Sequence, residues 1–95
     1  MKTALLATPG ENGISRLSVE EITLAPDEES GELSYSQEET FYFVVTGYGL
    51  LKSDVYGYAL EPQVGVYVPP STPHDVRNTG ATDCVMLRYR ALGAR

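Results

Sequence analysis

The chain has 95 residues, of which 42% are hydrophobic and 21% charged, the composition of a single globular domain. Thirteen acidic and seven basic side chains give a formal net charge of −6, and the basic residues are scattered along the chain. A nucleic-acid surface needs clustered cations to neutralise phosphates, so nucleic acid is excluded as a partner. A membrane partner is not expected, because no stretch reaches the roughly 20 apolar residues of a membrane span. The single cysteine, Cys84, cannot form an intramolecular disulfide, and we expect a cytoplasmic protein.

Residues 1–14 have no clear pattern, and we expect them to form an N-terminal arm or an edge strand. Residues 15–95 are predicted to form one barrel. Glycine and proline interrupt this region at short intervals, and no window between them carries a helical period over the usual length of a helix. Short strands at such spacing are typical of a β-sandwich or a β-barrel.

The clearest alternation lies in residues 32–47, where every second residue belongs to one set: Leu33, Tyr35, Gln37, Glu39, Phe41, Phe43 and Val45. Successive side chains of a strand point to opposite faces of the sheet. Because Phe41 and Phe43 are apolar, we expect this set to face the core. Glu39 and Gln37 would then be polar groups beside a wet cavity, since burying them unpaired would cost free energy.

Two further strands are expected nearer the C-terminus. Alternate valines in residues 64–68 lead into Pro69-Pro70, where the chain must turn because proline cannot donate to a strand ladder. Beyond the turn, His74 shares its parity with Val76, so both should face inward. Residues 84–91 are apolar on both parities and then alternate around Arg88, which indicates a closing strand with its end at solvent.

Two motifs, in this order, resemble those of the small single-domain cupins of the RmlC-like cupin superfamily. The second motif of that family is similar to Pro69-Pro70-Ser71-Thr72-Pro73-His74-Asp75-Val76-Arg77-Asn78, and the first to Glu38-Glu39-Thr40-Phe41-Tyr42 followed by Gly47-Tyr48-Gly49. The resemblance covers about residues 15–91 and implies an all-β fold. That fold is a small antiparallel double-stranded β-helix, or jelly-roll barrel, with a ligand inside.

The resemblance also implies where a metal would bind. It puts Leu33 and Tyr35 at the positions of two family histidines, Glu39 at the glutamate and His74 at the last histidine. Leucine has no lone pair to offer a metal. Compared with the first motif of the family, one extra residue lies between Glu39 and Gly47. This suggests a β-bulge that changes the direction of the glutamate side chain. We therefore expect no tightly bound metal, and a single divalent ion held by His74 and Glu39 is the alternative.

The expected function is the binding of a small molecule. Its pocket would be lined by Leu33, Gln37, Phe41, Phe43 and Val76. An inward imidazole and carboxylate can move a proton between two atoms of a substrate, so His74, Glu39 and Tyr35 are the candidate catalytic residues of a metal-independent isomerase, dehydratase or cyclase. A non-catalytic ligand sensor and a metal-dependent oxygenase or isomerase are the alternatives.

We also expect a homodimer. A barrel of 95 residues has a high ratio of surface to volume, and pairing with a second chain covers an open sheet edge. The segment 14–24 is the strand expected to cross over between chains.

Overall fold

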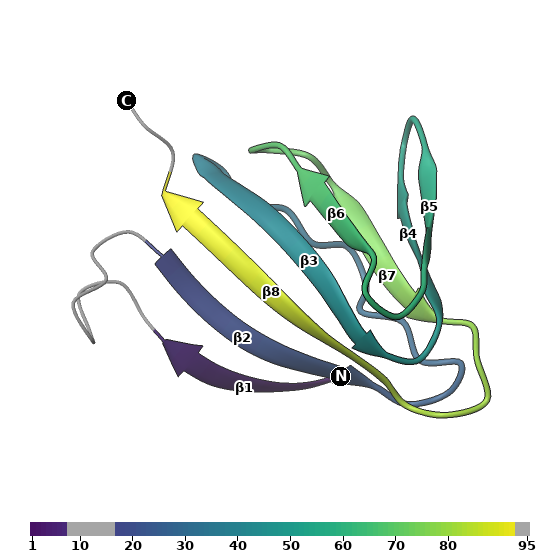
Figure 1. The fold of residues 1–95 in the computed structure, drawn as a ribbon. Coiled ribbons are helices and arrows are strands. Elements are labelled where there is room, and N and C mark those ends of the chain that lie inside the picture. The colour runs from purple at the N-terminus through teal and green to yellow at the C-terminus, as the bar shows by residue number, and fades with distance from the viewer. Residues whose placement is uncertain (8–16, 93–95) are drawn as a thin grey trace.

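The computed structural model describes residues 1–7 and 17–92. Within these ranges the regular structure consists of strands (Figure 1). They are β1 (Lys2–Ala7), β2 (Leu17–Leu24), β3 (Glu38–Thr46), β4 (Gly49–Ser53), β5 (Gly57–Leu60), β6 (Gly65–Val68), β7 (His74–Asn78) and β8 (Cys84–Leu92). No helix in this part of the chain is long and apolar enough to cross a membrane.

The strands form two sheets, and the neighbouring strands pair antiparallel. One sheet has the order β1-β2-β8-β3-β6 and the other β5-β4-β7, so strands distant in sequence lie side by side (Figure 1). The predicted all-β antiparallel fold is confirmed. Strand β1 lies at a sheet edge, whereas residues 8–14 of the expected arm lie outside the described ranges.

The hydrophobic core lies between the two sheets and takes side chains from both. Its buried members are Ile22, Leu24, Tyr42, Val44, Leu51, Leu60, Val66, Val68, Val76, Cys84 and Met86. Complete burial of one such aliphatic side chain stabilises the fold by about 1.5–3 kcal/mol. The core therefore packs the two sheets against each other.

The face of β3 that points into the core is the opposite of the predicted one. Thr40, Tyr42 and Val44 are buried, whereas Phe41 and Val45 are 41% and 42% exposed. The reason is a turn at residues 36–37, where the backbone of Gln37 adopts a φ of 64°. This left-handed residue interrupts the strand and resets its parity, because alternation continues only through extended backbone.

Phe41 and Phe43 therefore do not line an interior pocket. The ring of Phe41 lies over Gly65 of the neighbouring strand β6, where any side chain would collide with it. It also packs against Tyr89 of β8, with ring centroids 6.2 Å apart. An aromatic ring that covers a glycine on the next strand helps to hold the register of the pair.

Residues 17–24 are the described part of the segment 14–24, which is expected to cross over between chains. Residues 17–24 form β2, which pairs with β1 on one side and with β8 on the other. One edge of this sheet is β1, where Leu5 and Leu6 are more than half exposed. The homodimer itself stays a prediction.

Candidate functional site

His74 opens β7 directly after the proline-containing turn, and its ring points into the barrel as predicted. The residue is 3% exposed. Its backbone pairs with that of Leu33, through N–H to O=C bonds of 2.7 and 2.9 Å in the two directions. The ring has a partner on each nitrogen: Nδ1 lies 2.8 Å from the carbonyl oxygen of Thr72, and Nε2 lies 2.8 Å from the hydroxyl of Tyr42.

These two partners determine the tautomer of the neutral ring. The Thr72 carbonyl can only accept, so Nδ1 carries the proton and donates it. Nε2 then has a lone pair, and the Tyr42 hydroxyl donates to it. Both nitrogens of His74 are therefore occupied by groups of the protein itself.

Tyr42 stands on β3 in the centre of the barrel and is fully buried. Burial raises the pKa of its hydroxyl to about 12, against the opposing effect of the nearby Arg88 guanidinium. At neutral pH the hydroxyl therefore keeps its proton: it can donate a hydrogen bond, but it is a very weak acid. This suits the hydrogen bond to His74 better than it suits proton release.

The raised pKa of Tyr42 predicts a stability that falls in alkali. Below pH 10 the hydroxyl is protonated in both states, but between pH 10 and 12 only the folded protein keeps the proton. The free energy of unfolding should therefore drop by roughly 2–3 kcal/mol over this interval. Urea unfolding at stepped pH should show that Tyr42→Phe removes this part of the slope, whereas Tyr48→Phe, at an exposed position, keeps it. Equal slopes in both variants would contradict the assignment.

A buried ion pair between Arg88 and Glu20 lies next to Tyr42. Arg88 of β8 donates from Nε and Nη2 to Glu20 Oε1, at 3.0 and 2.9 Å. Arg90 reaches the same oxygen at 3.4 Å and also contacts Glu38 Oε1 at 3.3 Å. The Arg88 side chain is only 6% exposed and that of Glu20 14%. Burial alone would lower the pKa of Arg88, but Tyr35, Tyr42 and Glu20 outweigh it and raise the pKa.

Tyr35 covers the two guanidinium groups. Its ring centroid lies 5.3 Å from Arg88 Cζ and 4.5 Å from Arg90 Cζ, distances at which a ring attracts a cation. The same ring lies 6.5 Å from that of His74. The predicted neighbourhood of Tyr35 and His74 is therefore present in the structure.

A chain of polar side chains thus crosses the barrel from Glu20 through Arg88 and Tyr42 to His74. We refer to these four residues as the interior polar chain. Sequence reasoning missed most of it, and the expectation that residue 88 lies at a solvent-exposed strand end is wrong, because Arg88 is 5% exposed. The signal was available: Arg88 keeps the parity of two buried core residues of β8, and a polar residue in phase with a buried face requires a partner.

Glu39 lies outside this chain. It is exposed on the outer face of β3, because the turn at Gln37 shifts the parity of the strand. Desolvation, and then the charge and hydrogen bond of Glu39, raise the pKa of the Tyr67 hydroxyl on the neighbouring strand. The prediction that Glu39 faces His74 is therefore wrong. Gln37 is an exposed turn residue rather than a pocket residue.

The remaining predicted pocket residues pack into the barrel. Val76 is 2% exposed in the core, and Leu33 packs against the core from the segment before β3. Asn78, which closes the second motif, is fully buried. Its side-chain amide donates to the carbonyls of Leu24 and Thr82 and accepts from the backbone N–H of Gly80. These bonds connect the end of β7 to the end of β2 and to the loop that follows β7. Asn78 therefore has a structural part in the motif.

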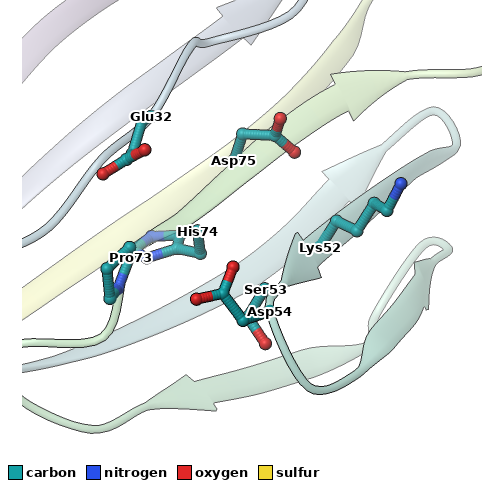
Figure 2. Close-up of a pocket in the computed structure, with 7 residues that line it drawn as sticks. All are labelled: Glu32, Lys52, Ser53, Asp54, Pro73, His74 and Asp75. Carbon is teal, nitrogen blue, oxygen red and sulfur yellow. The ribbon is translucent and has the colours of Figure 1, made fainter.

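A surface pocket of about 210 Å³ has His74 among its lining residues. Figure 2 shows its lining, with Lys52 extending away from Asp54. The lining residues are Glu32, Lys52, Ser53, Asp54, Pro73, His74 and Asp75. Its carboxylates do not form a metal site: in the described ranges, no three His, Cys, Asp or Glu side chains converge in a way that could hold an ion.

The sequence matches the family described as "Cupin domain" over residues 20–88, most of the chain. The chain is a cupin. Its fold is similar to that of a cupin superfamily protein from Desulfitobacterium hafniense DCB-2, with 22% identity, 98% of this chain and 77% of that one covered, and a TM-score of 0.81. No curated protein sequence matches this cupin.

Two other solved structures extend the likeness. A cupin 2 conserved barrel domain protein from Salinispora arenicola CNS-205 is 23% identical, with 95% of this chain and 74% of that one covered and a TM-score of 0.82. The Cupin_2 domain of an XRE family transcriptional regulator from Enterobacter cloacae is 21% identical. That comparison covers 98% of this chain and 97% of that one, with a TM-score of 0.84. At these identities the likeness concerns the fold.

In the cupin frame, the buried position nearest to the expected family glutamate is Thr40. It is 2% exposed, directly follows Glu39, and has six residues between it and Gly47. The barrel interior therefore has a hydroxyl at this point of β3, whereas the carboxylate of Glu39 is on the outer face.

Proposed function

We propose that this cupin binds a small molecule at the end of the barrel lined by the interior polar chain and Tyr35, without a tightly bound metal. The observation that carries the proposal is the engagement of both His74 nitrogens, by the Thr72 carbonyl and by the Tyr42 hydroxyl. An imidazole that coordinates a metal needs a free lone pair on one nitrogen. Here that lone pair accepts a hydrogen bond from the protein.

The donor set around His74 does not fit a metal. The resemblance puts Leu33 and Tyr35 at two ligand positions, and neither is an imidazole or a carboxylate. Glu39, at the third, is exposed on the outer face of β3, and the buried residue beside it is Thr40. The nearest buried cationic group is Arg88, which would repel a divalent ion. Zinc and similar ions are normally held by about three or four nitrogen, sulfur or carboxylate donors.

Among the candidate roles, we favour a ligand sensor. The side chains of the interior polar chain are held in place by hydrogen bonds within the protein, so they offer a polar ligand a fixed surface. The similarly sized Enterobacter cloacae domain belongs to a transcriptional regulator, and such a role is compatible with a barrel that binds a ligand without changing it. A sensor would transmit binding through a shift of the loop or strands that contact the ligand.

The test is to find the ligand and to ask whether it is altered. The protein, purified without chelator and without a histidine tag, is incubated with a small-molecule mixture and examined by native mass spectrometry, and bound molecules are identified after release. We expect a ligand in a metal-free complex, recovered unchanged. Binding that occurs only with one stoichiometric zinc, iron, manganese or nickel ion would contradict the proposal.

A second candidate is a metal-independent isomerase, dehydratase or cyclase. It is favoured by one observation, the position of His74 at the wall of the pocket of about 210 Å³. Tyr42, rather than Glu39, would orient the His74 ring, and His74 would exchange the proton with the substrate. Chemical conversion of the identified ligand by the wild-type protein, lost in Tyr42→Phe, would establish this candidate in place of the sensor.

A further inference from the structure

The two interior arginines have donors that the protein leaves unused. Arg88 Nη1 and Arg90 Nε are buried and have no hydrogen-bond partner. Tyr42 is a neighbour of this guanidinium: the charge and the hydrogen bonding of Arg88 both lower the pKa of the Tyr42 hydroxyl, against the larger effect of burial. Nη1 itself nevertheless has no acceptor at hydrogen-bonding distance and angle. A buried donor without an acceptor costs about 1–3 kcal/mol, more when it is charged, and calls for an explanation.

The two guanidinium groups that carry these donors lie close together. Both guanidinium groups contact the same oxygen, Glu20 Oε1, and the ring of Tyr35 lies over both. The ring attracts the two cations but offers no strong acceptor to their N–H groups. Tyr35 therefore covers the arginines while leaving their remaining donors unsatisfied.

The carboxylates of Glu20 and Glu38 do not accept hydrogen bonds from these two donors. Glu20 is engaged with one oxygen by both arginines, and Glu38 contacts only Arg90 Nη1, from a rim position where its side chain is 26% exposed. The side chain of Arg90 is 23% exposed, so this end of the barrel is reachable from solvent, whereas Arg88 is closed off behind it. An acceptor entering from this end would meet the two donors in turn.

We propose that the ligand of this cupin carries a carboxylate, which binds Arg88 Nη1 and Arg90 Nε and displaces the ring of Tyr35 from the two guanidinium groups. This inference rests on the proposed function and names its ligand class. Two donors on neighbouring guanidinium groups match the two oxygens of a planar carboxylate. The displaced ring is then free to pack against the remainder of the ligand, next to His74.

The experiment compares acids with their uncharged amides. Acetate, pyruvate and benzoate are titrated into the nitrogen-15-labelled protein, each beside acetamide, pyruvamide or benzamide, and arginine side-chain and Tyr35 resonances are followed by NMR. We expect at least one acid to bind, to shift the Arg88 and Arg90 signals and the Tyr35 ring, and to bind at least about tenfold more tightly than its amide. Saturation should abolish the ring-current effect of Tyr35 on the guanidinium protons.

Three variants test this site, and one of them controls for surface charge. Arg90→Gln is chosen because Arg90 is partly exposed and the fold depends on it less than on Arg88; it should weaken the acid about tenfold or more. Arg77→Gln removes an arginine whose side chain is 52% exposed, and it should leave the affinity unchanged. Tyr35→Leu should bind the acid at least as tightly as the wild type, because it removes the competing ring.

Failure of the inference and failure of the proposed function give different results. If none of the acids binds, or if acids and amides bind equally, or if Arg90→Gln binds like the wild type, the carboxylate site is overturned. If, in addition, the mixture examined by mass spectrometry yields an uncharged ligand, the proposed function survives without this inference. If it yields none, both are rejected.

Discussion

Glu20→Gln should destabilise the protein by about 3–5 kcal/mol. The substitution keeps the shape of the side chain and removes the charge that faces Arg88 and Arg90. Removing one member of a buried ion pair leaves the partner charged, desolvated and unpaired, which costs more than the pair contributed. Here a single oxygen of Glu20 serves two guanidinium groups, at 2.9 and 3.4 Å, so both lose their nearest counter-charge. Urea unfolding at neutral pH measures the difference.

Glu29→Gln is the matched control. Glu29 also faces an arginine, Arg77, but the two groups are 4.0 Å apart and both side chains are about half exposed. Water screens such a pair, so this variant should lose less than about 1 kcal/mol. A double-mutant cycle of Glu20→Gln with Arg88→Met should give a large favourable coupling energy. If Glu20→Gln costs no more than Glu29→Gln, the buried ion pair does not support the fold.

His74→Ala should destabilise the protein by about 3–5 kcal/mol. Three effects add: the ring leaves a cavity, the Thr72 carbonyl loses its donor, and the buried Tyr42 hydroxyl loses its acceptor. A residue in a wet cavity would be removed at little cost, so the size of the loss distinguishes a ring held by the protein from one held by solvent. Thermal and urea unfolding of the purified variant measure it.

Glu39→Gln is the informative comparison for His74. From the sequence, Glu39 is the expected partner of His74, and its replacement should then disturb the same pair. In the structure it lies on the outer face of β3, so the variant should stay within about 0.5 kcal/mol of the wild type. If Glu39→Gln lowers the free energy of unfolding nearly as much as His74→Ala does, Glu39 is the partner of His74, as expected from the sequence.

The fold and the place of His74 follow from patterns that the sequence displays. Alternating valines, the Pro69-Pro70 turn and the ordered motifs are local features, and each constrains the backbone by itself. The inward position of His74 was predicted correctly because no irregular residue separates it from Val76. Parity is a reliable guide within an uninterrupted strand.

The partner of His74 was not predictable in the same way. One left-handed residue, Gln37, reverses which face of β3 is buried, and glutamine is not a residue type that marks such a turn. Phe41 and Phe43 reinforced the error, since aromatic residues on an outer face look the same in sequence as core residues. The alternation that contains Thr40, Tyr42 and Val44 is apolar enough to be buried, but it requires knowledge of the turn to be chosen.

The ion pair between Glu20 and Arg88 could not be predicted from the sequence for a different reason. Glu20 and Arg88 are far apart in the chain and meet only because β2 and β8 are neighbours in register. Each residue shares the parity of its strand's buried side chains, which marks it as a group that needs a partner. The identity of that partner depends on the pairing of the sheet, which no local pattern contains.

The central claim, that the protein itself occupies both nitrogens of His74, has one direct measurement. His74 is the only histidine of the chain, so the imidazole nitrogen signals in a long-range proton–nitrogen NMR spectrum belong to it without further assignment. At about pH 8, where an ordinary imidazole is neutral, we expect a protonated Nδ1 and an unprotonated, hydrogen-bonded Nε2, both unchanged on addition of zinc chloride. An Nε2-protonated ring, or a zinc-dependent shift of either nitrogen signal, would contradict the account.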